Sequence, residues 1–114
     1  MKEKPRVWFT PLHSAECSHA IARQVFYRKI SQAEADAVFD TLKRDRADSL
    51  WLETTMPENV FELCAELGRR YAPKLGVRTA DTLHVACALE LKADRFWTFD
   101  ERQAKLAKTQ GMKT

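Results

Sequence analysis

The sequence has no long apolar run, and none of its segments approaches the roughly 20 apolar residues needed to cross a bilayer. Residues 1–6 are not followed by an apolar stretch of signal-peptide length. The chain also has no block of Lys or Arg, no low-complexity tract and no internal repeat. These absences argue against a membrane or repeat protein, and the expected location is the cytoplasm.

The cysteines are odd in number. Cys17, Cys64 and Cys87 are far apart, and none of them belongs to a Cys-x-x-Cys pair. Because all three fall among apolar neighbours in segments expected to be helical, we expect reduced, buried thiols and no disulfide framework. His13, Cys17 and His19 have a helical spacing that zinc could use, but the sequence offers no evident fourth ligand.

The chain also lacks a Ser-His-Asp, a Cys-His and a P-loop signature. Its 114 residues fit a single domain spanning residues 1–114. Hydrophobic residues make up 45% and charged residues 31%, which indicates a globular chain and excludes a disordered one. The net charge of +3 is compatible with a nucleic-acid partner but is weak evidence for one.

Short strands alternate with helices along the sequence. β-Branched and aromatic residues predict strands at residues 6–9, 49–53 and 95–99. Helical periodicity and turn residues predict helices at about 11–29, 31–46, 57–72, 79–91 and 100–110. This order predicts βαβ units, and hence an α/β fold with a parallel sheet flanked by helices.

Most of the expected helices have a recognisable start. The expected N-caps are Thr10, Ser31, Thr79 and Asp100, the last of these together with Gln103. Pro57 is expected to open the third helix, which should end before the loop 73–76. The fourth helix is apolar on most sides and should therefore be largely buried.

Three acids occupy positions where chemistry is expected. Glu16 lies in the second turn of the helix after the first strand, Asp81 in the first turn of the buried helix, and Asp100 directly after the third strand. Ligands of parallel sheets bind beyond the carboxyl ends of the strands, so these carboxylates could converge at one sheet edge. Carboxylate oxygens suit Mg²⁺ or Mn²⁺, which can activate water for an in-line phosphoryl displacement.

Each acid also has a structural interpretation. Glu16 could be an ordinary solvated residue, and Asp81 could interact only with the dipole of its helix. Asp100 could act as an N-cap, a role compatible with metal binding because a carboxylate has two oxygens. The nearby bases could contact phosphates or be solvated, and these are Lys74, Arg78 and Arg102.

Two C-terminal segments together resemble the PIN-domain ribonuclease family. Residues 78–89, with the sequence RTADTLHVACAL, are similar to the segment that contributes the third family acid. Residues 93–100, with the sequence ADRFWTFD, are similar to the segment that contributes the fourth. Residues 10–16, TPLHSAE, resemble the segment of the second acid more loosely. The resemblance extends over nearly the whole chain in order and spacing.

The resemblance implies a PIN-like, Rossmann-like parallel sheet and a metal-dependent endoribonuclease that cleaves single-stranded or structured RNA. Glu16, Asp81 and Asp100 would hold Mg²⁺ or Mn²⁺, and the hydroxyl of Thr98 would support the metal site. The chain looks most like the toxin nucleases of bacterial toxin–antitoxin pairs, often called VapC-like. The implied partners are RNA, a small antitoxin whose tail covers the site, and a second copy in a homodimer.

One feature departs from the family pattern. Family members usually begin with a hydrophobic strand that ends in the first acid, whereas no Asp ends a strand before Thr10. The expectation is therefore a PIN-like domain that is incomplete at its N-terminus, through truncation, a misplaced start or strand exchange in a dimer. A catalytically inactive PIN-like domain that binds a protein partner is the alternative function. A small interaction domain whose acids are only caps and surface charges is the third.

Overall fold

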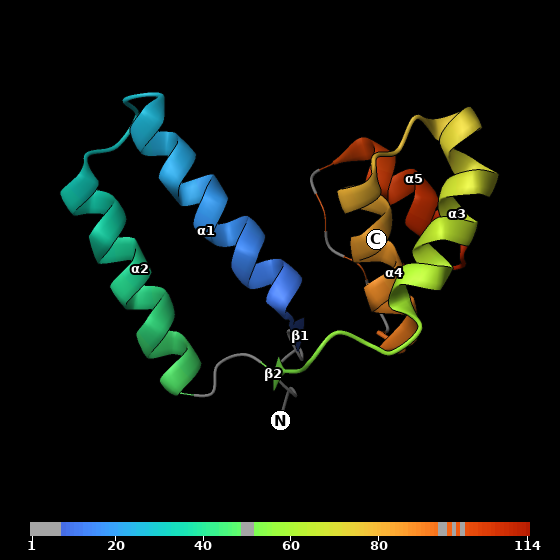
Figure 1. Ribbon diagram of the computed structural model, residues 1–114, viewed down its shortest axis with the longest axis horizontal. Coiled ribbons are helices and arrows are strands. Elements are labelled where there is room, and N and C mark those ends of the chain that lie inside the picture. Colours follow the sequence, from blue (N-terminus) through green and yellow to red (C-terminus); the bar gives the residue numbers. More distant parts are fainter. Residues whose placement is uncertain (1–7, 49–51, 94–95, 97, 99) are drawn as a thin grey trace. The chain divides into compact units, whose positions relative to one another are not determined.

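The computed structural model describes residues 8–48, 52–93, 96, 98 and 100–114 (Figure 1). The chain divides into two compact units, Met1–Thr55 and Met56–Thr114, and each is described by itself. The organisation of residues 1–114 as one domain stays a prediction.

The first unit contains a small parallel sheet. Strand β1 (Trp8–Phe9) pairs with β2 (Leu52–Glu53), with Trp8 opposite Leu52. The crossover between them consists of helices α1 (Pro11–Phe26) and α2 (Gln32–Ala47), which form a hairpin (Figure 1). The predicted α/β class with parallel strands is confirmed, while residues 6–7 and 49–51 of the predicted strands lie outside the described residues.

Local chemistry sets the bounds of both hairpin helices. Thr10 is the N-cap of α1 as predicted, and its side chain accepts a hydrogen bond from the His13 backbone N–H. The capping box at the start of α2 is also confirmed, because the Ser31 N–H donates to Glu34 Oε1 (3.1 Å) and the Glu34 N–H donates to Ser31 Oγ (3.0 Å). Helix α1 ends three residues before the predicted Lys29, since Arg28 adopts a left-handed φ of 58°.

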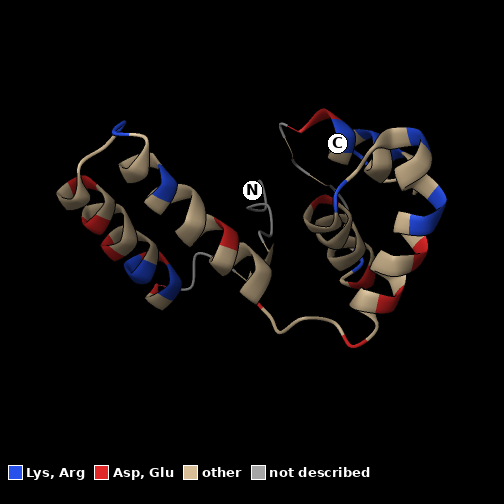
Figure 2. Ribbon diagram, turned by 45° about the horizontal axis from the view of Figure 1, so that its top comes forward, with Lys and Arg blue, Asp and Glu red and all other residues tan. Residues whose placement is uncertain are grey.

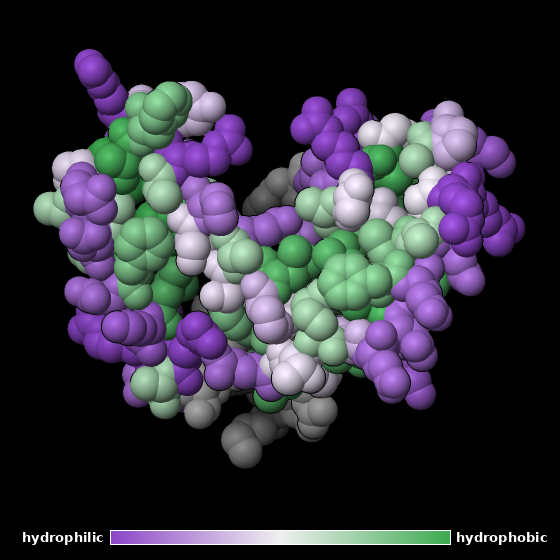
Figure 3. Space-filling model, in the orientation of Figure 1, coloured by the Kyte–Doolittle hydropathy of each residue, from purple (hydrophilic) through white to green (hydrophobic). Residues whose placement is uncertain are grey.

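The hairpin buries little of its own surface. Helix α1 has no buried residue, and Ala35 is the buried residue of α2. Phe26 is 79% exposed and Tyr27 is 53% exposed. In Figure 3, apolar side chains accordingly reach the surface of the α1–α2 hairpin. Packing within this unit therefore contributes less hydrophobic stabilisation than packing within the second unit.

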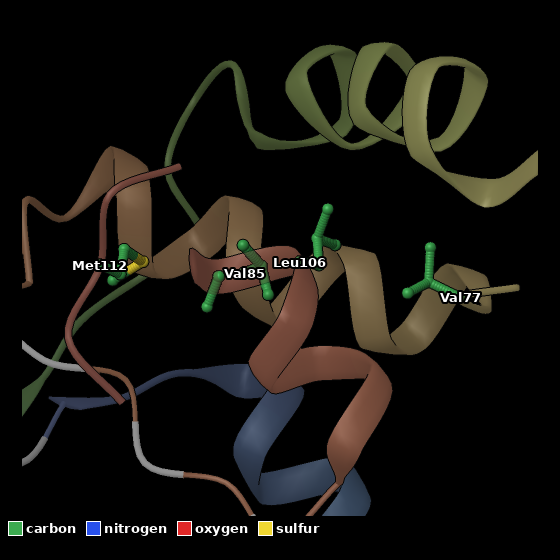
Figure 4. Packing of buried hydrophobic residues seen from close by; sticks show 5 residues of the cluster. Val77, Val85, Leu106 and Met112 are labelled. Atoms are coloured by element: carbon green, nitrogen blue, oxygen red, sulfur yellow. The ribbon is translucent and has the colours of Figure 1, made fainter. Parts of the chain in front are cut away.

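The second unit is a packed group of three helices, α3 (Val60–Leu75), α4 (Thr79–Glu90) and α5 (Glu101–Thr109). Its core is a cluster around Val85 and Leu106, both fully buried, with Val77 and Met112 packed beside them (Figure 4). The prediction that the fourth helix is largely buried is confirmed, and its buried residues are Thr82, Val85, Ala86 and Cys87. This core fixes the start of α4 relative to the start of α5.

Both predicted ends of the third helix were wrong. Helix α3 begins at Val60, because Pro57 opens a turn in which its carbonyl accepts from the Val60 N–H (3.2 Å). The helix then continues through Pro73 to Leu75. A proline in the last turn removes one helical hydrogen bond. The helix stops there because the C-cap Gly76, whose N–H still donates to the Ala72 carbonyl (2.9 Å), turns the chain with a left-handed φ of 65°.

The predicted third strand, residues 95–99, lies mostly outside the described residues. Phe96 and Thr98 are described, and neither has strand structure. The Phe96 N–H donates to the Lys113 carbonyl (2.8 Å), which connects this segment to the end of the chain.

The thiols are free, as predicted. Cys64 and Cys87 are buried, whereas Cys17 is half-buried, so full burial of all three was not correct. Across the described residues, no helix combines the length and apolar character that crossing a membrane requires.

Candidate active site

Asp81 lies at the third position of α4, and both of its oxygens are engaged. Its Oδ2 accepts from the Arg78 backbone N–H (3.2 Å), and its Oδ1 accepts from Gln103 Nε2 (3.2 Å). The N-cap of this helix is Arg78, not Thr79 as predicted. Arg78 has an extended backbone, while Thr79 already has helical structure, and a guanidinium has no acceptor that could cap the helix. Asp81 therefore orders the first turn of α4.

Asp100 is the N-cap of α5, as predicted. Its Oδ1 accepts from the backbone N–H groups of Arg102 (2.8 Å) and Gln103 (3.0 Å). Its Oδ2 accepts no hydrogen bond from the described residues, and Asp100 is exposed to solvent. One oxygen thus holds the helix while the other is accessible to a ligand.

Thr98 links Asp100 to α5. Its Oγ1 accepts from the Asp100 N–H (2.9 Å) and donates to Gln103 Oε1 (2.7 Å). The predicted pairing of Asp100 with Gln103 at the helix start is therefore only half right. The carboxylate does accept from the Gln103 N–H, but the Gln103 side chain does not return to the Asp100 N–H, because the Thr98 hydroxyl already accepts that bond.

Gln103 connects the three predicted site residues of this unit, and sequence reasoning missed its role. Its backbone N–H donates to Asp100, its Oε1 accepts from Thr98, and its Nε2 donates to Asp81. The available signal was the position of Gln103 three residues after a capping Asp. That spacing predicts a hydrogen bond between the Gln103 side chain and the Asp100 N–H, and not the contact with Asp81. We call Asp81, Thr98, Asp100 and Gln103 the aspartate network.

Glu16 is exposed on α1 and belongs to the other unit. A groove lies at the carboxyl ends of β1 and β2, where parallel sheets usually bind ligands. Helix α1 lines it with the face that carries Ser14, Ala15 and Ser18, and Glu16 is not among the lining residues. The convergence of Glu16 with the two aspartates stays a prediction.

The charges at this groove compensate each other. Arg46 Nε forms an ion pair with Glu53 Oε1, and the Arg46 guanidinium lies 5.1 Å from the centre of the Phe9 ring. Both side chains of the ion pair are 46% exposed, so the pair is expected to contribute about 0–1 kcal/mol. The groove is therefore not a strongly charged site.

The oxygen ligands of the aspartate network fit a hard divalent cation. Carboxylates and a hydroxyl suit Mg²⁺ or Mn²⁺ better than zinc, which favours nitrogen and sulfur ligands. Within the ranges that the structure describes, no group of three or more His, Cys, Asp or Glu side chains is close enough to hold a metal. A metal site built on the two aspartates would therefore need a further ligand from elsewhere.

Two exposed arginines flank the aspartates in sequence. Arg78 precedes α4, and Arg102 lies in the first turn of α5. Neither guanidinium forms an ion pair with a described residue, so both are available to an anionic ligand. Figure 2 shows a further charge pattern on α3, with acids at its start and bases toward its end.

Comparison with known proteins identifies one family. The model of the PIN domain family matches residues 1–109, which include Glu16, Asp81, Thr98 and Asp100. No curated protein and no solved structure matched the chain.

Proposed function

The chain belongs to the PIN domain family, and on this premise we propose that it is a metal-dependent endoribonuclease. Family membership indicates a nuclease-type function, and PIN domains generally depend on a divalent metal ion. The observation that carries the proposal is the aspartate network, in which Asp81 and Asp100 both bind Gln103 and Asp100 keeps one oxygen accessible.

Each site residue has a defined task in this proposal. Asp81 and Asp100, together with Glu16, would hold Mg²⁺ or Mn²⁺. The bound ion would supply an activated water molecule and offset the negative charge of the phosphate. The hydroxyl of Thr98 keeps Asp100 in place by accepting its N–H, and this supports the predicted role of Thr98 beside the metal.

The substrate is proposed to be RNA, either single-stranded or structured. Arg78 and Arg102 would contact phosphates of the substrate, because arginine binds phosphate through paired N–H donors. Their exposed side chains and their closeness in sequence to the aspartates support this assignment.

The more specific proposal is a toxin nuclease of a toxin–antitoxin pair, acting in the cytoplasm. The resemblance of residues 78–89 and 93–100 to such toxins supports it. It predicts that a small antitoxin encoded nearby suppresses the RNA cleavage of this chain when the two are mixed. Cleavage that persists at a molar excess of that antitoxin would count against the toxin assignment.

A second candidate is a catalytically inactive PIN-like domain that binds a protein partner. The exposed Phe26, Tyr27 and Val38 of the α1–α2 hairpin favour it, because large apolar side chains on a surface can mark an interaction site. Cleavage of RNA by the purified chain would exclude this candidate.

The test of the leading proposal is RNA cleavage with Mn²⁺, compared between the parent chain and Asp81→Asn. The amide side chain retains one oxygen that can accept the Arg78 N–H, so the first turn of α4 should persist. We expect cleavage by the parent, loss of cleavage when Mn²⁺ is chelated, and none by Asp81→Asn. Asp40→Asn changes an exposed acid of α2 and serves as the control. Equal cleavage by the parent and Asp81→Asn would refute the site.

A further inference from the structure

Gln103 is the residue on which the aspartate network depends. Asp81 and Gln103 lie on different helices, 22 positions apart in sequence, and their side chains meet at 3.2 Å. The Gln103 amide also accepts from Thr98 at 2.7 Å, while its backbone N–H contacts Asp100 at 3.0 Å. One side chain therefore ties the first turn of α4 to the segment that precedes α5.

Three hydrogen bonds of the network form a chain that runs in one direction. The Asp100 N–H donates to the Thr98 hydroxyl, this hydroxyl donates to the Gln103 amide oxygen, and the amide N–H donates to Asp81. The orientation of the amide follows from its neighbours, because an ionised carboxylate can only accept and therefore needs the NH₂ group. Bonds in such a chain polarise and strengthen one another.

The core alone does not fix the Asp81 carboxylate. Packing of Val85 against Leu106 sets the position of α4 relative to α5, but Asp81 is only half-buried. The Gln103 amide and the Arg78 N–H hold its two oxygens from two sides, which selects one rotation of the carboxylate. Each oxygen retains a lone pair, because a carboxylate has about four acceptor positions.

We propose that Gln103 is a positioning residue, which holds the Asp81 carboxylate in a fixed orientation relative to Asp100 so that both aspartates present oxygens to one divalent ion. This inference rests on the proposed metal-dependent function. Hydrogen-bond partners of metal-ligating side chains usually tune metal affinity by about 10–100-fold. Gln103 is such a hydrogen-bond partner, because its side chain binds Asp81 and its backbone N–H binds Asp100.

The experiment compares the full-length chain with Gln103→Met and Gln110→Met. Methionine has nearly the length of glutamine but lacks its amide, so Gln103→Met removes both side-chain hydrogen bonds. Gln110 provides the matched control, because it is also half-buried, follows the end of the same helix and binds Thr109 (2.9 Å) outside the network. Calorimetric titration with Mn²⁺ should give a Kd about 10–100-fold weaker for Gln103→Met and an unchanged Kd for Gln110→Met.

Two further readouts separate positioning from a merely structural role. The metal ligands remain in Gln103→Met, so its RNA cleavage should recover at saturating Mn²⁺, whereas that of Asp81→Asn should not. In the parent, diamagnetic Mg²⁺ should shift the side-chain amide NMR signals of Gln103 but not those of Gln110. Gln103→Asn keeps an amide but shortens its reach, so this variant should also bind Mn²⁺ more weakly. It takes the place of Gln103→Met if the methionine variant does not fold.

Each outcome decides the question. If the parent binds Mn²⁺ and both Gln103 variants bind it equally well, the positioning role is wrong and the proposed metal site stands. The same conclusion follows if the variants only lower the unfolding temperature without changing Kd. If the parent binds no Mn²⁺, the proposed function and this inference are both overturned.

Discussion

Replacing Asp100 by Asn and by Ala separates its capping role from its proposed metal role. The Oδ1 of Asp100 accepts two backbone N–H groups of α5, and an Asn side chain can accept both in the same way. Asn and Asp are about equally good N-caps, whereas Ala typically costs about 1 kcal/mol. Because 1 kcal/mol shifts the midpoint of a domain near this size by roughly 4–8 °C, metal-free Asp100→Ala should unfold roughly 4–8 °C below Asp100→Asn.

The same variants respond differently to metal. Mn²⁺ at 100 times its Kd should stabilise the parent by about 2.7 kcal/mol, a rise of roughly 10–20 °C in the midpoint. Asp100→Asn should show no such rise, because it lacks the charged oxygen that would bind the ion. Thermal unfolding followed by circular dichroism measures both effects. A midpoint of Asp100→Asn as low as that of Asp100→Ala would refute the capping argument, and an undiminished rise with Mn²⁺ would refute the metal assignment.

Two further predictions concern the core of the second unit. Leu106 is fully buried, so Leu106→Ala should lower the free energy of unfolding, measured in urea, by about 2–5 kcal/mol. Phe61→Ala is the control, because its ring is 64% exposed and its loss should change stability by about 0.5 kcal/mol or less. Similar losses in both variants would contradict the core described above. Burial, assisted by the neighbouring Cys64, raises the pKa of the Cys87 thiol to about 11. As the pH rises from about 8.5 toward that value, the unfolded chain releases a proton that the folded chain retains, so stability should fall. In urea unfolding, Cys87→Ala should show a flatter fall with pH than the parent, and an equal fall in both would contradict the burial of this thiol.

Three of the helix starts could be predicted because their chemistry is local. The caps at Thr10, Ser31 and Asp100 each depend on residues no more than three positions away, and all three are confirmed. The end of α3 was missed because Pro73 was interpreted as a helix breaker. In the last turn it costs a single hydrogen bond, and Gly76 determines where the helix stops.

The sequence predicts individual residues of the candidate site but not the contacts between them. The places of Asp81 and Asp100 at the starts of two helices follow from sequence pattern, and the structure confirms them. The contact between Asp81 and Gln103 depends on how α4 packs against α5, which no local pattern encodes. The capping motif even pointed the Gln103 side chain to a different partner, because the sequence does not reveal that Thr98 accepts the Asp100 N–H.

The proposed metal site is tested most directly by comparing the Mn²⁺ affinity of the parent chain with that of Glu16→Gln. The proposed site has three acids, Glu16, Asp81 and Asp100. It predicts measurable Mn²⁺ binding by the parent, a clearly weaker Kd for Glu16→Gln, and an unchanged Kd for the control Asp40→Asn. An equal Kd for the parent and Glu16→Gln would contradict the three-acid site, and an absence of Mn²⁺ binding by the parent would contradict the metal-dependent nuclease itself.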